Sequence, residues 1–295
     1  MGWLDANLLT ILNGLALAAL LFLIAVGLSL VFGTMDVLNL AHGAVGLAGA
    51  YVGVALLEPG DGIARFMVAV LVALAVGLVV GLGLTILTRG VRDHLRQALL
   101  TLGLALVAAD VLRQFFGADV ETVAAPTAVA GSVEVFGKAY PTYRLCVIAA
   151  SLTIGLLLYY VVERTQVGAV VRATVADRTM VEAIGIRTIL VLAGVFGIGT
   201  ALAALGGLLA GPVLGAQPGL DSTILLLALV VVVIGGLGSI KGAALGAILV
   251  GQVQTLGVSL FPDQASFLLF GAMAIVLLVR PSGLLPAPYA AAVAK

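Results

Sequence analysis

The chain has 295 residues, of which 62% are hydrophobic and only 9% charged, with fourteen acidic and fourteen basic side chains. Soluble domains carry about 45–50% apolar and about 25% charged residues, so this composition excludes a soluble protein. The zero net charge, without a basic patch that contains aromatics, gives no support for nucleic-acid binding. The single cysteine, Cys146, excludes a disulfide framework and a thiolate metal cluster.

A membrane-spanning helix needs about 20 mostly apolar residues. Nine segments reach or nearly reach that length, which predicts an all-α integral membrane protein. We expect one helix-bundle domain over residues 1–295, with about nine spans (8 to 10). The second and the seventh to eighth segments are the weakest, because glycine and polar residues interrupt them. The segments cover residues 8–32, 37–57, 64–88, 95–117, 142–162, 189–211, 222–236, 243–260 and 265–280.

The distribution of Lys and Arg predicts the orientation, because these residues collect in cytoplasmic loops. With the N-terminus outside and the C-terminus inside, ten basic residues fall in inner segments. Four fall in outer segments, namely Arg65, Arg113, Lys138 and Arg144. The asymmetry places residues 163–188 in the cytoplasm and residues 117–141 outside.

The outer loop at residues 117–141 contains a short alternation of polar and apolar side chains. Ser132 to Phe136 lies between Gly131 and Gly137, which predicts a strand or hairpin over the outer mouth. The hairpin could be a structural cap or could contact an external partner.

Small residues recur four positions apart in several apolar segments, a spacing that lets helices approach closely in lipid. This pattern predicts tight helix packing. The pairs are Gly49/Gly53, Gly77/Gly81, Gly207/Gly211 and Gly238/Gly242.

Polar residues interrupt two apolar segments, and polar residues at membrane depth tend to mark transport pathways. The first interruption contains Thr34, Asp36, Asn39, His42 and the following Gly43. We expect it to supply a substrate pathway, although His42 could equally be bonded inside the bundle. The second interruption, Gly235 to Ala247, resembles the first, and paired broken segments are typical of transporter sites.

Asp110 is the one acidic residue well inside a predicted span. Arg113 and Gln114 lie three and four residues further on, so both can share its helix face. We expect an Asp110–Arg113 ion pair with a structural role, and a proton relay is the alternative.

Residues 163–188 form a polar interval with four arginines against three acids. Asp177 can cap a short helix, and Gly185 can take the left-handed turn that ends it. A two-turn helix is not stable alone in water. We therefore expect it to pack against the rest of this chain or against another subunit. Docking of another protein is one interpretation of the interval, and an ordinary positive-inside loop is the other.

No catalytic constellation is visible. The glycine-rich stretch from Gly235 to Gly242 is not a phosphate loop, because Ile240 and Gly242 flank its lysine in place of glycine and Ser or Thr. We therefore expect no enzyme activity, no metal and no cofactor bound by this chain.

Four stretches resemble the LivH-type permease subunit of branched-chain amino acid ABC importers, in the right order and over nearly the whole chain. They are GLSLVFGTMDVLNLAHGAVGLAGAYVG, GAVVRATVADRTMVEAIGI, VVIGGLGSIKGAALGAILVG and LLVRPSGLLP. The resemblance implies a subunit of a bacterial or archaeal plasma membrane that has no ATPase of its own. It implies a second permease subunit, two cytoplasmic ATPase subunits that bind the ATP, and an external solute-binding protein.

The same resemblance implies that the central loop, residues 163–188, is the segment that docks on the ATPase. It therefore favours docking over an ordinary loop. The family usually has an acid after the HG pair, where this chain has Ala44, and its members also move urea, amides and aromatic acids. The expected coupling residues are Gly168, Arg172, Ala173, Asp177, Ala183 and Gly185, together with Glu182.

The hypothesis is half of a translocation pore that works by alternating access. Branched-chain amino acids or a related small solute would pass along walls that include Asn39 and His42. An ion-coupled secondary transporter would need a cluster of acids at depth, and an intramembrane enzyme would need a catalytic pair. The sequence shows neither.

Overall fold

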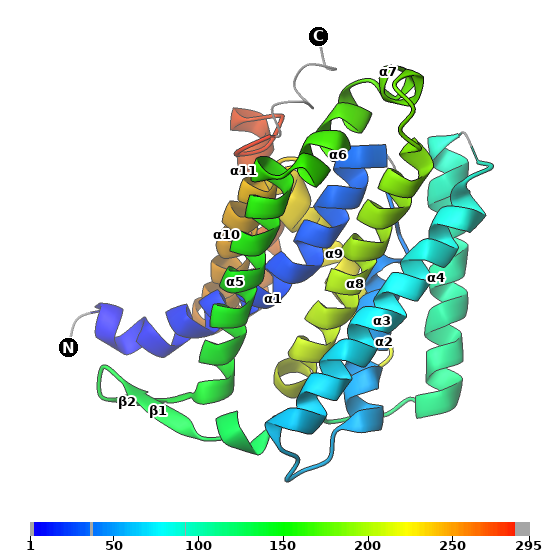
Figure 1. Ribbon diagram of the computed structural model, residues 1–295. Helices are drawn as coiled ribbons and strands as arrows, with labels where there is room; N and C mark the ends of the chain where they lie inside the picture. Colours follow the sequence, from blue (N-terminus) through cyan, green and yellow to red (C-terminus); the bar gives the residue numbers. More distant parts are fainter. Residues whose placement is uncertain (1–2, 36–37, 92, 287–295) are drawn as a thin grey trace.

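The computed structural model describes residues 3–35, 38–91 and 93–286. They form a bundle of helices that run up and down between two ends (Figure 1). The principal helices are α1 (Trp3–Met35), α2 (His42–Leu56), α3 (Ile63–Thr88), α4 (His94–Phe116), α5 (Thr142–Arg164), α8 (Thr188–Leu214), α9 (Leu220–Gly235), α10 (Ile240–Leu260) and α11 (Ala265–Val279). The smaller elements are α6 (Gln166–Ala176), α7 (Arg178–Ala183), two 3-10 turns (Thr127–Val129 and Pro262–Gln264) and a hairpin of β1 (Ser132–Val135) and β2 (Lys138–Pro141).

Each of the nine predicted segments coincides with a principal helix. Seven helices of the described chain are long and apolar enough to cross a membrane, the last of them being α11 together with the 3-10 turn before it (Pro262–Val279). The other two, α2 and α9, have only 15 and 16 residues. These two belong to the segments that the sequence interrupts. Non-helical residues 38–41 precede α2, and the left-handed glycines Gly236 and Gly238 separate α9 from α10.

Helices α1 and α8 form the centre of the bundle. α1 packs against α5, α8, α9 and α10, and α8 also packs against α2 and α3. Residues 20–28 of α1 and 199–211 of α8 are buried without interruption. The outer helices α3, α4, α5 and α11 instead expose large apolar side chains, for example Ile86 (74%) and Leu278 (84%). Such surfaces are suited to lipid or to partner helices.

Glycines bring the central helices into backbone contact. A Cβ atom on Gly207 of α8 would lie 1.8 Å from the carbonyl oxygen of Gly46 in α2. A Cβ atom on Gly49 would lie 1.9 Å from the carbonyl oxygen of Ala204. No side chain larger than hydrogen fits there without separating the helices, so the predicted tight packing is confirmed at these positions.

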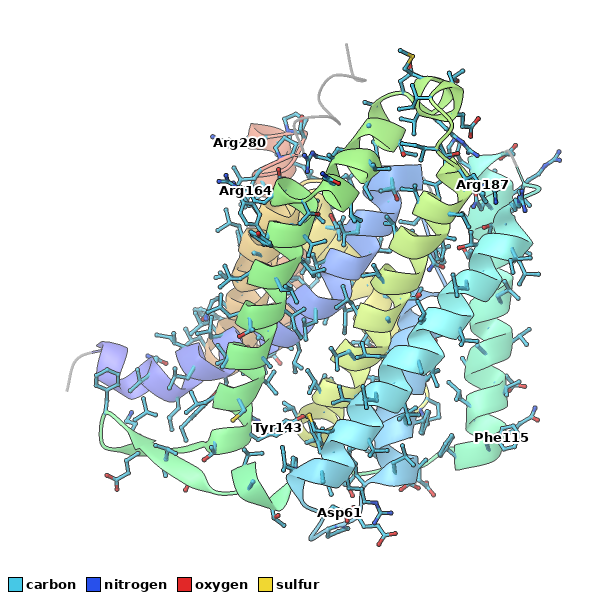
Figure 2. All side chains as sticks on the ribbon, in the orientation of Figure 1. Asp61, Phe115, Tyr143, Arg164, Arg187 and Arg280 are labelled. Atoms are coloured by element: carbon cyan, nitrogen blue, oxygen red, sulfur yellow. The ribbon has the colours of Figure 1, made fainter. Side chains whose placement is uncertain are left out.

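The two ends of the bundle differ in charge and structure. We call them the arginine end, with α6, α7, Arg164, Arg187 and Arg280, and the hairpin end, with β1, β2 and Asp61 (Figure 2). The described chain begins beside the hairpin end, and α11 finishes at the arginine end (Figure 1). Arg164, Arg187 and Arg280, which the sequence assigned to inner segments, therefore gather at one end.

The predicted hairpin is confirmed. β1 and β2 pair antiparallel, with Val135 opposite Lys138. Phe136 and Gly137 both have positive φ, 51° and 76°, as a two-residue hairpin turn requires. Glu121 and Ala216 exchange backbone hydrogen bonds of 2.8 Å, which fastens the start of this loop to the α8–α9 connection.

The glycine contact between α2 and α8 predicts an asymmetry between two alanine variants. Gly207→Ala should lower the melting temperature of the detergent-solubilised chain, because overpacking costs about 1–3 kcal/mol. Gly83→Ala in α3 is the control, since nothing lies within 4 Å of its Cβ position. It should melt at or above the parent temperature, because alanine is the better helix former. Equal melting of both variants would refute the close-packing argument.

Candidate functional site

The connection between α5 and α8 folds as two helices, α6 and α7, whereas the sequence predicted only the second. Thr165 begins α6, and its hydroxyl accepts a hydrogen bond from the N–H of Gly168 at 3.3 Å. The unrecognised signal was this threonine cap directly after the basic end of α5. We call residues 165–187 the linker unit; it lies at the arginine end (Figure 1).

The corner between α5 and α6 explains two of the predicted coupling residues. A Cβ atom on Gly168 would lie 2.1 Å from the carbonyl oxygen of Val162, so only glycine lets α6 fold back this closely. The guanidinium of Arg172 donates to the same carbonyl. That carbonyl belongs to the last turn of α5, where helical partners are missing. Gly168 and Arg172 therefore fix the angle between the two helices.

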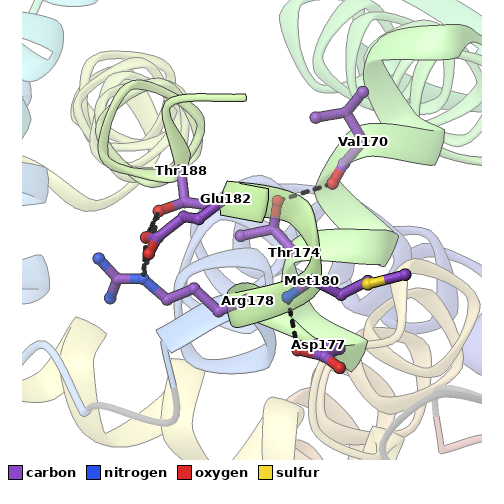
Figure 3. Close-up of polar contacts among 7 residues, drawn as sticks. All are labelled: Val170, Thr174, Asp177, Arg178, Met180, Glu182 and Thr188. Carbon is purple, nitrogen blue, oxygen red and sulfur yellow. Dashed lines mark hydrogen bonds and ion pairs between the residues drawn. The ribbon is translucent and has the colours of Figure 1, made fainter. Parts of the chain in front are cut away.

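Helix α7 has the two ends that the sequence predicted. The carboxylate of Asp177 accepts a hydrogen bond from the N–H of Met180 at 2.9 Å (Figure 3). Gly185 has φ +88°, and its N–H donates to the carbonyl of Glu182. At the preceding junction, the N–H of Asp177 donates to the carbonyl of Ala173 at 2.9 Å. Asp177 thus ends α6 with its backbone and begins α7 with its side chain.

Glu182 connects α7 to the first turn of α8. Its carboxylate accepts hydrogen bonds from the hydroxyl of Thr188 and from Nε of Arg178, the latter at 3.0 Å (Figure 3). The hydroxyl of Thr188 and the guanidinium of Arg178 hold the pKa of this carboxyl below its ordinary value. Thr188 is buried, so the contact ties an exposed helix to the central helix of the bundle.

The side chains of α7 divide into an inward and an outward face. Val181 is buried, whereas Met180 and Ile184 are 62% and 67% exposed. Ala173 and Ala183 are also exposed. The linker unit therefore presents apolar side chains away from the bundle on a helix that is anchored at both ends.

The polar break before α2 brings Asn39, His42 and Gly43 together. Asn39 is fully buried, and its Oδ1 accepts a hydrogen bond from the N–H of Ala41 at 3.1 Å. His42 is also fully buried, and its Nε2 lies 2.8 Å from the carbonyl oxygen of Ile24 in α1, so Nε2 carries the proton. Among the described residues, Nδ2 of Asn39 and Nδ1 of His42 have no hydrogen-bond partner. Two unused polar groups thus lie in the interior at the start of α2.

Gly43 and Thr34 are placed differently. A Cβ atom on Gly43 would lie 2.2 Å from the carbonyl oxygen of Asp221, so Gly43 is a contact point between α2 and α9. The hydroxyl of Thr34 donates to carbonyls of its own helix, at Leu30 and Val31. Asp36 lies outside the described residues.

Thr101 of α4 is a structural partner of this break that sequence reasoning missed. It is fully buried, and its Oγ1 accepts a hydrogen bond from the N–H of Leu40 at 3.1 Å while donating to the carbonyl of Ala98. The hydroxyl satisfies a backbone group of the non-helical segment that has no helical partner. The available signal was a single threonine within the fourth apolar segment.

Comparison with known proteins identifies the family. The family described as "Branched-chain amino acid transport system / permease component" matches residues 10–278. The chain belongs to this family. It is 30% identical to the high-affinity branched-chain amino acid transport system permease protein BraD of Pseudomonas aeruginosa, over 94% of this chain and 95% of that protein. It is 29% identical to the LivH permease proteins of Salmonella typhimurium and of Escherichia coli K12, over 94% of each chain. No solved structure gave a significant match.

Membership confirms the resemblance that the four sequence stretches indicated. The protein is a permease subunit of the ABC type and a multi-pass protein of the inner membrane. The structure gives a role to the fourth of these stretches, LLVRPSGLLP, which includes the segment after α11. The N–H groups of Leu284 and Leu285 donate to the carbonyls of Ile234 and Gly235, at 2.8 and 2.9 Å. The segment after α11 therefore satisfies the free carbonyls at the end of α9.

The expected ion pair between Asp110 and Arg113 is wrong. Asp110 accepts a hydrogen bond from Nε2 of Gln114 at 2.9 Å, and no ion pair with Arg113 forms within the described part of the permease. Both side chains are exposed on α4, so neither charge is buried within this chain and burial inside the bundle does not force the two to pair.

The contact between Thr101 and Leu40 predicts a specific loss of stability. Thr101→Val keeps the shape but removes the acceptor, and an unpaired buried N–H costs about 1–3 kcal/mol. The melting temperature of the purified permease should fall. Thr153→Val in α5 is the control, because that exposed hydroxyl bonds only to Ala149 of its own helix and should change little. The same melting temperature for both variants would show that Thr101 does not stabilise the break.

Proposed function

We propose that this permease forms one half of the translocation pathway of an ABC importer for branched-chain amino acids or a related small solute. The single observation that carries the mechanism is the linker unit, which projects from the arginine end and is fastened to both α5 and α8. The relatives BraD and LivH are named as high-affinity branched-chain amino acid permeases, which supports the substrate class. In this proposal ATP is bound by two separate cytoplasmic subunits, and the permease needs no cofactor.

The proposed topology has about nine spans, with the N-terminus outside and the C-terminus inside. Helices of 15 and 16 residues are roughly 22–24 Å long, against a hydrocarbon core of about 30 Å. The non-helical residues 38–41 and 236–239 would complete the crossings of α2 and α9. Buried protein surroundings make such breaks tolerable at membrane depth. The gathering of arginines at one end supports placing that end in the cytoplasm.

Coupling would begin where an ATPase subunit docks on the outward face of α7. The exposed Met180 and Ile184 suit an apolar cleft on such a partner. A displacement of α7 would pass to α8 through Glu182 and Thr188, and to α5 through the corner at Val162. Since α8 is the central helix, its movement would change the packing of α1, α2 and α3. The ATPases must favour one of the two arrangements, because only differential affinity can drive the change.

The substrate would pass close to the break that holds Asn39 and His42, beside a second permease subunit. In this structure α2 and α9 meet at Gly43, so passage would require these helices to separate. Ala44 lies in an apolar cluster with Leu84 and Phe196. These surroundings suit an aliphatic side chain. An external binding protein would deliver the solute at the hairpin end.

The orientation can be tested with single cysteines in a Cys146→Ser background. Glu134→Cys should react with a membrane-impermeant thiol reagent on intact cells, because the hairpin is expected outside. Arg178→Cys should react only after the membrane is opened. Labelling of position 178 but not of position 134 on intact cells would reverse the proposed topology.

The coupling role can be tested at Gly185 with a matched control. Gly185→Val places a β-branched residue at φ +88°, which is strained, and should distort the end of α7. Asp177→Ala removes the cap at a cost of about 0.5–2 kcal/mol to the helix. Both variants should reach the membrane at near-normal abundance, capture less of the ATPase subunits and transport less, with an unchanged order of substrate preference.

Gly60→Val is the control. Gly60 has φ +101° and, like Gly185, has nothing within 4 Å of its Cβ position, but it precedes α3 at the hairpin end. It carries similar strain and should leave ATPase capture intact. Full capture and full uptake by Gly185→Val would make the linker unit an ordinary connection.

A further inference from the structure

A basic cleft lies beside the linker unit at the arginine end. It has a volume of about 340 Å³ and lies between the end of α3, helix α7 and the start of α8. Arg89, Arg178 and Arg187 line it, together with the carboxylate of Glu182. Three cations from three separate segments thus surround one opening, against one anion.

The carboxylate does not neutralise the cleft. Glu182 is already engaged by Arg178 and by the hydroxyl of Thr188. Arg89 and Arg187 form no ion pair with any carboxylate of the described chain. Both are exposed, and they flank the cleft from the residue after α3 and the residue before α8. Their guanidinium groups present planar forks that match the oxygens of a phosphate.

Large exposed apolar side chains follow the cleft arginines along α3 and α8. Ile86 and Leu87 of α3 are 74% and 56% exposed, and Leu190 of α8 is 64% exposed. These residues lie within one turn of Arg89 and Arg187, on the side toward the middle of the bundle. The surface therefore changes from cationic to apolar over about one helical turn, roughly 5 Å. An acidic side chain of a soluble partner would match the cations but would leave this apolar surface uncovered.

We propose that the cleft binds the phosphate headgroup of an anionic phospholipid, with Arg89 and Arg187 as its cationic partners and the acyl chains along Ile86 and Leu190. Basic pockets between membrane helices are a recognised setting for anionic headgroups. The lipid would bridge the end of α3 to the junction of α7 and α8. It would therefore stabilise the same junction through which the proposed coupling passes, although the binding itself does not depend on that function.

The test measures lipid retained by the full-length permease, purified in detergent and titrated with phosphatidylglycerol or phosphatidylcholine. Native mass spectrometry resolves the bound lipids. The parent should retain phosphatidylglycerol in preference to phosphatidylcholine. The double variant Arg89→Gln/Arg187→Gln should weaken phosphatidylglycerol binding roughly tenfold or more, because it removes two cationic contacts to the anionic headgroup at once. Phosphatidylcholine binding should not change.

The matched control removes two other arginines from the same end. Arg164 and Arg280 lie across that end from Arg187 (Figure 2). Arg164→Gln/Arg280→Gln should bind phosphatidylglycerol as the parent does. An equal loss in both double variants would mean diffuse attraction by surface charge and would overturn the proposal. Melting temperatures of both variants should match the parent, which separates loss of binding from unfolding.

Two further arms distinguish other occupants of the cleft. Glycerol 3-phosphate should not displace phosphatidylglycerol at equal concentration, because it lacks the chains; displacement would indicate a site for soluble phosphate. Capture of the ATPase subunits by Arg89→Gln/Arg187→Gln is measured in parallel. Unchanged lipid binding with lost capture would assign the cleft to a protein carboxylate and overturn the lipid site.

Discussion

The structure depends on backbone contact between helices that have no hydrophobic reason to associate in lipid. Lipid chains are as apolar as leucine, so the helices must gain from close van der Waals packing. Glycines of α8 supply it: Gly199 meets Gly27 of α1, and Gly207 meets Gly46 of α2. Helix α8 therefore behaves as an internal spine with α1, α2 and α3 fitted against it. At these glycines the backbones are already so close that a Cβ atom would clash, so the helices cannot approach further there.

Because α8 packs against α1, α2 and α3, a segment attached to α8 is connected to the whole centre of the bundle, and the linker unit is such a segment. Glu182 holds α7 to the first turn of α8, and the carbonyl of Val162 holds α6 to the last turn of α5. The depressed pKa of Glu182 sets the range in which its contact persists. The ionised carboxylate stabilises the junction above the ordinary carboxyl pKa, and this stabilisation is lost as the pH falls through the lower folded value. At neutral pH the connection from α7 to the spine is therefore fully formed.

The sequence could predict features that depend on neighbouring residues. The cap at Asp177 and the turn at Gly185 follow local rules, and the nine apolar segments follow from length and composition. Features that depend on distant residues were missed or wrong. Thr101 acts on Leu40, 61 positions away in the chain. By spacing alone, Asp110 could bond to Arg113 or to Gln114. Only the fold shows that its side chain lies outside the interior of the bundle and bonds to Gln114. Helix α6 was missed because its amphipathic residues lie within a loop-like charged interval.

The two breaks in the bundle are also connected in a way that spacing could not show. Residues 38–41, the first break, follow α1. The second break also touches α1, because a Cβ atom on Gly33 would lie 2.5 Å from the Cα atom of Gly238. Both interruptions therefore flank the same helix, on the half nearer the arginine end. Backbone groups that leave a helix at depth need protein partners, and Thr101, Asn39 and Ser239 provide some of them. The unpaired nitrogens of Asn39 and His42 belong to the first of these breaks. In the proposed mechanism, separation of α2 from α9 at Gly43 would open these two groups to a passing polar solute, which could form the hydrogen bonds that they lack here.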